Sequence, residues 1–176
     1  MTTFNTDVDF GAGSIPRAYE ANLVPLLFEP YARDVARMSR QSDARILETA
    51  CGSGVVTRAL DRTVPESAQI TATDFSPGML DIARSSSASD RITFAQADAT
   101  ALPFESNAFD LVVCQFGVMF FEDELEAYRE ARRVLDHDGR MIFSTWSSLE
   151  NNPIPSFLND HCLLYTSPSP RDIGES

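Results

Sequence analysis

The feature that most constrains the fold of this chain is an apolar run that leads into a loop of small residues and then into a helical pattern. Residues 45–50, which include the acidic Glu48, have the pattern of a strand, and residues 50–54 form the loop. The stretch 55–61 then continues as a helix. A strand, a glycine loop and a helix in this order present backbone amides and a helix N-terminus to a polar ligand, as in α/β proteins.

The rest of the chain repeats the alternation of strands and helices. Phe121, Leu125, Tyr128, Ala131 and Leu135 recur at helical spacing and predict an amphipathic helix that ends at Asp138-Gly139. We expect further helices at 17–40, interrupted by prolines, and at 77–85, and strands at 69–73, 92–96, 108–115 and 140–146. This order predicts an α/β fold: a three-layer, Rossmann-like, doubly wound and mainly parallel sheet. We also expect Phe120 and Phe121 in the core.

Composition and charge exclude several classes of function. The formal net charge of the 176 residues is −12, so nucleic acid and anionic membranes are disfavoured partners. No apolar run reaches the roughly 20 residues of a membrane helix, and the N-terminus lacks the pattern of a secretion signal. The three cysteines and two histidines lack the spacing of a disulfide framework or a metal site. We therefore expect a cytoplasmic protein without a metal.

Three acidic residues lie at or just beyond the ends of predicted strands, where open α/β sheets bind ligands: Glu48, Asp74 and Asp98. Asp74 follows Gly54 by 20 residues, and its carboxylate can accept hydrogen bonds from both hydroxyls of a ribose. Nicotinamide enzymes and methyltransferases share this feature. The G-x-G-x-x-G spacing of a pyrophosphate loop would place its third glycine at Thr57, so it does not fit, and the absence of lysine excludes a P-loop.

Five segments in order resemble a class I S-adenosylmethionine-dependent methyltransferase of the small-molecule branch related to ubiquinone biosynthesis. The resemblance covers roughly Tyr19 to Asn152. It rests on E-x-x-C-G-S-G at 48–54, ATDFSPGML at 72–80, QADATALPF at 96–104, FDLVVCQFGVMFF at 109–121 and EAYREARRVLDHDGRMIFSTW at 126–146.

The resemblance implies where S-adenosylmethionine would bind. Glu48 and the loop through Ala50, Gly52 and Gly54 would hold the methionine moiety, and Asp74 would hold the ribose hydroxyls. The family often has glycine where this chain has Ala50, and alanine is small enough to serve there.

Four more positions would form the adenine site. Phe75 and Met79 would sandwich the ring, and Asp98 with the backbone of Ala99 would contact its edge. These assignments come from the resemblance alone.

The remaining positions would face the reacting groups. Gln115 and Phe116, at the end of the fourth strand, would lie beside the sulfonium and the acceptor, and Tyr19 would lie on a segment that covers the site. The residues after that strand are not the N-P-P-Y motif of methyltransferases that act on nucleic-acid amino groups, which favours a small-molecule acceptor. The sequence identifies no catalytic residue, no acceptor and no oligomeric state.

The sequence also predicts the domain organisation. We expect residues 1–15 to be mobile, residues 16–152 to form the methyltransferase domain, and residues 153–176 to be a non-native or disordered tail. The tail contains Tyr165–Pro170, which cannot continue a helix or a central strand, and its CLLYTSPSPRD stretch resembles translated adaptor sequence. The resemblance implies further strands after the fifth, so we expect a sheet that lacks its last strands and a chain that is poorly soluble or inactive.

Two alternatives to methyl transfer stay open at this point. The first is a nicotinamide-dependent oxidoreductase, which shares the acidic residue after the second strand. The second is a fragment that binds the cofactor without catalysing a reaction.

Overall fold

A computed structural model of the chain describes residues 19–148 and 151–152. The chain divides into two units, Met1–Thr145 and Trp146–Ser176, and the helices and strands reported below belong to the first. The predictions for the mobile segment 1–15 and the tail 153–176 concern residues outside those described.

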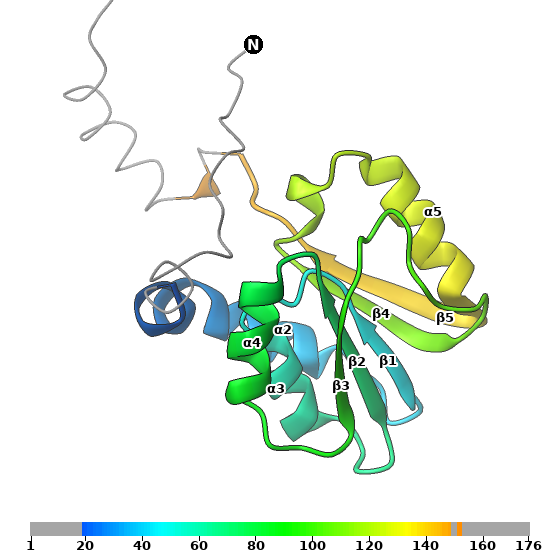
Figure 1. Cartoon of the computed structure of the whole chain (residues 1–176), viewed down its shortest axis with the longest axis horizontal. Coiled ribbons are helices and arrows are strands. Elements are labelled where there is room, and N and C mark those ends of the chain that lie inside the picture. Colours follow the sequence, from blue (N-terminus) through cyan, green and yellow to red (C-terminus); the bar gives the residue numbers. More distant parts are fainter. Residues whose placement is uncertain (1–18, 149–150, 153–176) are drawn as a thin grey trace, which may run out of the picture. The chain divides into compact units, whose positions relative to one another are not determined.

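A five-stranded parallel sheet forms the centre of the first unit (Figure 1). Its strands are β1 (Arg45–Glu48), β2 (Gln69–Asp74), β3 (Ile92–Gln96), β4 (Phe109–Gln115) and β5 (Leu135–Ser144), in the spatial order β3-β2-β1-β4-β5. Every strand pairing is parallel, which confirms the predicted class of sheet. The strand order reverses between β1 and β4, and open α/β sheets bind their ligands at the carboxyl ends of the strands beside such a reversal.

Helices cover both faces of this sheet. The crossovers α3 (Val55–Thr63) and α4 (Pro77–Ser85) lie on one side in Figure 1, and α5 (Glu124–Val134) lies on the other. Alternate residues of a strand point to opposite faces. Accordingly, Ile46 packs in a cluster with α3, whereas the next residue, Leu47, packs in a cluster with α5. The predicted three-layer, doubly wound architecture is therefore confirmed.

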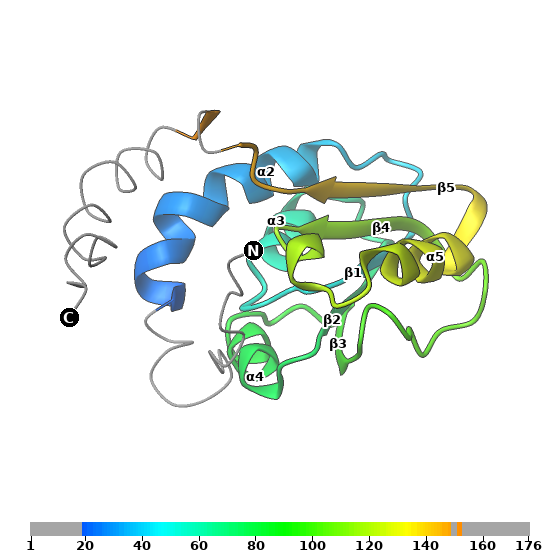
Figure 2. The same cartoon turned by 90° about the horizontal axis from the view of Figure 1, so that it is seen from above.

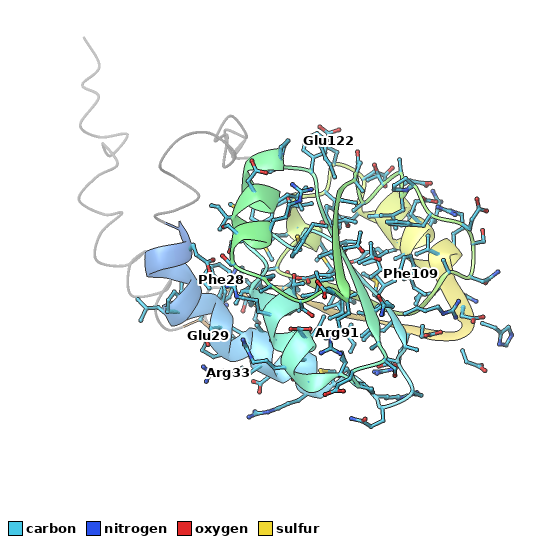
Figure 3. The ribbon with its side chains drawn as sticks, turned by 60° about the horizontal axis from the view of Figure 1, so that its bottom comes forward. Phe28, Glu29, Arg33, Arg91, Phe109 and Glu122 are labelled. Carbon is cyan, nitrogen blue, oxygen red and sulfur yellow. The ribbon has the colours of Figure 1, made fainter. Side chains whose placement is uncertain are left out.

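Two helices precede the sheet, as the prolines of this region predict. η1 (Tyr19–Phe28) is a π-helix that contains Pro25, and α2 (Glu29–Arg37) has Pro30 in its first turn, where a missing N–H costs no helical bond. Figure 2 shows η1 at the end of the sheet toward which the arrowheads of β4 and β5 point. In Figure 3, Phe28 marks the point where η1 passes into α2.

The boundary between α5 and β5 differs from the prediction. The helix ends at Val134, and β5 begins at Leu135 instead of Arg140. The guanidinium of Arg132 donates to the carbonyl of Leu135, whose backbone is already extended. The pairing with β4 then shifts register before Arg140, so Asp138-Gly139 belongs to an irregularity in the strand and does not end the helix.

The buried face of α5 agrees with the expected one only in part, since Ala131 and Leu135 are buried as predicted. Leu125 is exposed, and the buried residues of this helix are Ala127, Ala131 and Val134. Asp123 caps the helix by accepting a hydrogen bond from the N–H of Glu126, and this cap places the start of the helix after Phe121.

Charged side chains join the strands at the opposite, amino-terminal edge of the sheet. The guanidinium of Arg45, at the start of β1, donates to the carboxylates of Asp110 in β4 and Asp136 in β5. The hydrogen bond from Arg45 holds the pKa of Asp110 below its ordinary value. Asp110 and Asp136 line a hollow of about 290 Å³ together with Asp43 and Arg140, which form an ion pair of 2.7 Å. Asp110 thus has the structural role of aligning neighbouring strands.

No helix among the described residues is both long enough and apolar enough to cross a membrane.

Candidate functional site

The loops after β1, β2 and β4 meet at the carboxyl-terminal edge of the sheet. The N–H of Cys51 donates to the carbonyl of Thr73, and the N–H of Gly52 donates to the carboxylate of Asp74. Thr49 N–H donates to the carbonyl of Val113 in β4. The loop after β1 is therefore held by both neighbouring strands, at the position where the strand order reverses.

Glu48 is buried at the centre of this edge. Glu48 is 2% exposed, and the hydroxyl of Thr57 donates a hydrogen bond to its Oε2 at 2.6 Å. The hydroxyl of Thr73 donates to the backbone carbonyl of Glu48 and fixes the end of the strand. Burial raises the pKa of Glu48 to about 8; the bond from Thr57 opposes this rise, and the nearby charge of Asp74 adds to it. Glu48 is thus a carboxyl group that a bound cation would help to ionise.

The loop that follows Glu48 contains three residues in left-handed conformation: Ala50 (φ 52°), Gly52 (φ 55°) and Gly54 (φ 83°). A Cβ placed on Gly52 would meet no atom within 4 Å, so this backbone is open to close approach by a ligand. A Cβ on Gly54 would lie 3.2 Å from the Cβ of Ala83 in α4. Gly52 therefore suits ligand contact, whereas Gly54 allows α3 to pack closely on α4.

The carboxylate of Asp74 links the loops after β1 and β2. Its Oδ2 accepts from the N–H of Gly52 and its Oδ1 from the N–H of Ser76, both at 2.8 Å. Burial raises the pKa of Asp74, and the two backbone hydrogen bonds oppose this effect. An ionised carboxylate has about four acceptor positions, so Asp74 can also receive two ligand hydroxyls.

The predicted adenine-binding residues have different environments. Phe75 is 73% exposed, and its backbone carbonyl accepts a hydrogen bond from the side chain of Gln96. Met79 is buried in the first turn of α4, which Ser76 caps. Asp98 is exposed, and its Oδ1 accepts from the N–H and the hydroxyl of Thr100. The exposed ring of Phe75 is thus available to a planar ligand.

The end of β4 contacts the N-terminal helices. Gln115 donates through Nε2 to the carbonyl of Phe28 at 3.2 Å. The ring of Phe116 lies edge-on to the rings of Phe28 and Tyr31, at centroid distances of 5.7 and 5.3 Å. Phe116 has a φ of 53°, which turns the chain sharply after β4. These contacts place η1 and α2 beside the carboxyl edge of the sheet.

The loops after β1 and β4 also touch each other directly. A Cβ on Gly117 would lie 2.6 Å from the Cβ of Ala50 and 2.8 Å from the Sγ of Cys114. Glycine at position 117 therefore accommodates the alanine at position 50. The structure corrects the expectation for Phe120, which is 75% exposed, whereas Phe121 is half-buried.

Sequence reasoning missed three polar residues at this edge: Thr57, Arg58 and Glu20. Thr57 and Arg58 lie in the first turn of α3, directly after the glycine loop. This short spacing in the sequence could have indicated that they lie near Glu48. Glu20 lies far away in sequence, and only the fold brings it to Arg58. The structure describes Tyr19 only as the first residue of η1.

Cys51 has no role as a nucleophile in this geometry. The residue is buried and packs in a cluster with Ala72 and Leu80. Burial, with a smaller contribution from the charge of Glu48, raises the pKa of its thiol well above the ordinary value. The thiolate is therefore scarce at neutral pH, as expected for a packing residue.

A doubly wound sheet with a glycine-containing loop after β1 and carboxylates at the ends of β1 and β2 is typical of Rossmann-like proteins that bind nucleosides or nucleotides. Residues 47–143 match a family described as methyltransferase domain, and the chain belongs to this family. The predicted membership of a methyltransferase family is therefore confirmed.

Known proteins agree with this assignment. The chain is 36% identical over 120 residues to a ubiquinone/menaquinone biosynthesis C-methyltransferase of Hahella chejuensis, covering 66% of this chain and 48% of the relative. It is 35% identical over 109 residues to a demethylmenaquinone methyltransferase of Staphylococcus epidermidis, covering 61% of this chain and 45% of the relative. The chain thus spans about half the length of the curated relatives it matches.

A solved structure from Methanococcus maripaludis, named for S-adenosylmethionine-dependent methyl transfer, superposes with a TM-score of 0.68. The two sequences are 25% identical, and the match covers 84% of this chain and 71% of the other. The methyltransferase family and this solved structure support S-adenosylmethionine as the cofactor, which confirms the prediction from the sequence. Membership of the methyltransferase family speaks against the alternative of a nicotinamide cofactor.

We predict that Gly117→Ala lowers the free energy of unfolding by about 1–3 kcal/mol, because its Cβ would overlap Ala50 and Cys114. Ala50→Gly removes one of these contacts and also suits a left-handed backbone, so the double variant should recover part of the loss. Urea denaturation of the wild type, both single variants and the double variant measures this coupling. If Gly117→Ala lowers the free energy of unfolding by the same amount with alanine and with glycine at position 50, positions 117 and 50 are not in contact.

We predict that Glu48→Gln stabilises the protein at alkaline pH. The pKa of Glu48 is about 8 in the folded protein and near 4.5 in the unfolded chain. Ionisation of Glu48 therefore favours unfolding increasingly as the pH rises between these two values. The stability difference should shift toward the variant over this range by up to about 4–5 kcal/mol and level off above about pH 8, while the burial cost of the amide is the same at every pH.

Thermal or urea unfolding at a series of pH values measures this difference. Glu66→Gln, at an exposed position between α3 and β2, serves as the matched control and should leave the free energy of unfolding unchanged. A stability difference for Glu48→Gln that does not vary with pH would show that the carboxyl group is ionised in the folded protein.

Proposed function

We propose that this chain transfers a methyl group from S-adenosylmethionine to a small molecule. The observation that carries the proposal is the pair of carboxylates, Glu48 and Asp74, on either side of an open glycine loop at the reversal of strand order. Membership of the methyltransferase family supports it.

In this proposal the amino-acid end of the cofactor lies against Glu48 and the loop through Ala50, Gly52 and Gly54. The cofactor is a cation, and Glu48 is a buried carboxyl group to whose Oε1 no described residue donates a hydrogen bond. Ionising Glu48 beside a cation recovers the free energy that burial of its charge costs. Gly52 lets the ligand approach the backbone closely.

The nucleoside end of the cofactor lies along the ends of β2 and β3. Asp74 uses its two remaining acceptor positions for the ribose hydroxyls. Phe75 covers the adenine ring from its exposed position and Met79 supports the other face. Asp98, which has Oδ2 left after its contacts with Thr100, and the backbone of Ala99 contact the edge of the ring.

The acceptor lies next to the end of β4 in this proposal. Gln115 and Phe116 border the methyl group, and Tyr19, at the start of η1, covers the site. The exposed ring of Phe120 offers apolar surface on the same loop. Because the relatives are named for demethylmenaquinone and ubiquinone/menaquinone biosynthesis, the hydroquinone form of a demethylmenaquinone is the first acceptor to test.

The residues at this edge act by positioning. S-adenosylmethionine supplies an activated methyl group when bound, and transfer needs donor and acceptor held in line at about 3–3.5 Å. Aromatic rings near the sulfonium contribute roughly 0.5–2 kcal/mol each. No histidine among the described residues lies at this edge, since His137 is exposed at the other end of the sheet. The contribution assigned to this chain is therefore orientation and exclusion of water.

We further propose a cytoplasmic enzyme whose partners include neither nucleic acid nor a membrane, so the demethylmenaquinone is best tested in a short-tailed, water-soluble form. The net charge of −12 supports this part of the proposal, because it repels phosphate backbones and anionic lipids.

We predict that Asp74→Ala weakens binding of S-adenosylhomocysteine by roughly 1.5–3 kcal/mol for each charge-assisted hydrogen bond lost. Isothermal titration calorimetry measures the affinity. Asp81→Asn removes an exposed carboxylate from α4, forms the matched control and should bind as the wild type does. Unchanged affinity in Asp74→Ala would remove Asp74 from the ribose site, and absence of binding to the wild type would refute the proposed function.

A further inference from the structure

Arg58 of α3 connects the glycine loop with the N-terminal helix η1. Its guanidinium donates to the carbonyl of Ser53 at 2.8 Å and to Oε1 of Glu20 at 2.7 Å. Both charged side chains of this ion pair are partly buried, with exposures of 21% for Arg58 and 26% for Glu20. Arg58 thus binds one residue of the glycine loop, Ser53, and one residue of η1, Glu20.

Each partner of Arg58 has a second polar atom that is buried and unpaired. Within the described part of the chain, neither Oε2 of Glu20 nor Oγ of Ser53 has a hydrogen-bond partner. Ser53 is only 1% exposed. Buried polar atoms in folded proteins almost always have partners, and leaving one unpaired costs about 1–3 kcal/mol. Two residues bound by one arginine thus each keep an acceptor atom that a hydrogen-bond donor from outside the chain could satisfy.

The acceptor atoms around this position suit a donor with several N–H groups. Glu20 contributes a carboxylate, and its ion pair with Arg58 occupies only one of the two carboxylate oxygens. Arg58 also lies near Glu48, because its charge opposes, as the smallest contribution, the rise that burial imposes on the pKa of Glu48. Ser53 lies between the two glycines of the loop that binds the amino-acid end of the cofactor in the proposed function. The group at that end with several N–H donors and a positive charge is the ammonium.

We infer that Glu20 and Ser53 bind the ammonium group of the cofactor, so that η1 contributes a residue to the cofactor site. This inference rests on the proposed function and extends it to a residue outside the core of the methyltransferase domain. Oε2 of Glu20 and Oγ of Ser53 accept from the ammonium, while Arg58 holds both residues in place. Binding of the cofactor and docking of η1 are therefore coupled.

The test combines one variant with two ligands. S-adenosylhomocysteine carries the ammonium, and its desamino analogue has hydrogen in that position. Glu20→Gln keeps the size of the side chain and an oxygen that can accept from Arg58, but removes the charge. Calorimetry on the full chain should show that the wild type prefers S-adenosylhomocysteine by about tenfold or more, and that Glu20→Gln loses most of this preference.

Two further variants keep the result interpretable. Ser53→Ala removes only the hydroxyl and should reduce the same preference by a smaller factor. Asp34→Asn, which removes a carboxylate from an exposed ion pair on α2, is the matched control and should retain the full preference. Circular dichroism melting of each variant confirms that it is folded before its affinities are compared.

Three outcomes would overturn the inference while leaving the proposed function intact. They are a wild type that binds both ligands equally, a Glu20→Gln variant that retains the wild-type preference, and an equal loss of affinity for both ligands in that variant. The last would show that Glu20 acts only through the position of η1. A wild type that binds neither ligand would instead refute the proposed function, and the inference with it.

Discussion

The arrangement of this site depends on the burial of one carboxyl group at the reversal of strand order. Glu48 ends β1 between β2 and β4, and among the described residues only Thr57 donates a hydrogen bond to its carboxyl group. Ionising Glu48 therefore has an electrostatic cost that the described residues do not relieve. Such a cost is typical of a binding site, because a cationic ligand that relieves it gains affinity from it.

The surrounding loops are built to keep this carboxyl group in place. Thr73 binds the backbone of Glu48, Asp74 binds the N–H of Gly52, and Ala50 lies against Gly117 from the loop after β4. Each contact joins the loop after β1 to a neighbouring strand or loop. Asp74 thus has two functions, since it orders the glycine loop and also offers acceptor positions to a ligand. Rigid placement of this kind is what positioning catalysis requires.

The sequence predicts most of the fold because local and global signals agree there. The apolar run of β4, the proline and serine at the start of α4 and the glycine loop each specify one local structure, and the structure has them within one or two residues. The end of α5 was missed because Asp138-Gly139 suits both a helix end and an irregular strand, and only the pairing of Leu135 with Phe109 decides between them.

The candidate site likewise combines residues that local sequence patterns reveal with residues that only the tertiary fold brings together. Glu48, Asp74 and the loop glycines could be recognised because they lie at fixed distances from strand ends. The ion pair of Glu20 with Arg58 spans 38 residues, and the exposure of Phe120 depends on where the loop after β4 turns. Contacts of this kind follow from tertiary packing and have no periodic signal in the sequence.

The ionisation of Glu48 is the most direct test. In protein labelled with ¹³C at glutamate side chains, the carboxyl resonance of Glu48, assigned by its absence in Glu48→Gln, can be followed by NMR against pH. Without ligand it should titrate at about pH 8, and with saturating S-adenosylmethionine it should remain ionised to well below neutrality. A resonance that titrates near pH 4.5 in both cases would contradict the role of this buried carboxyl group in binding the cofactor.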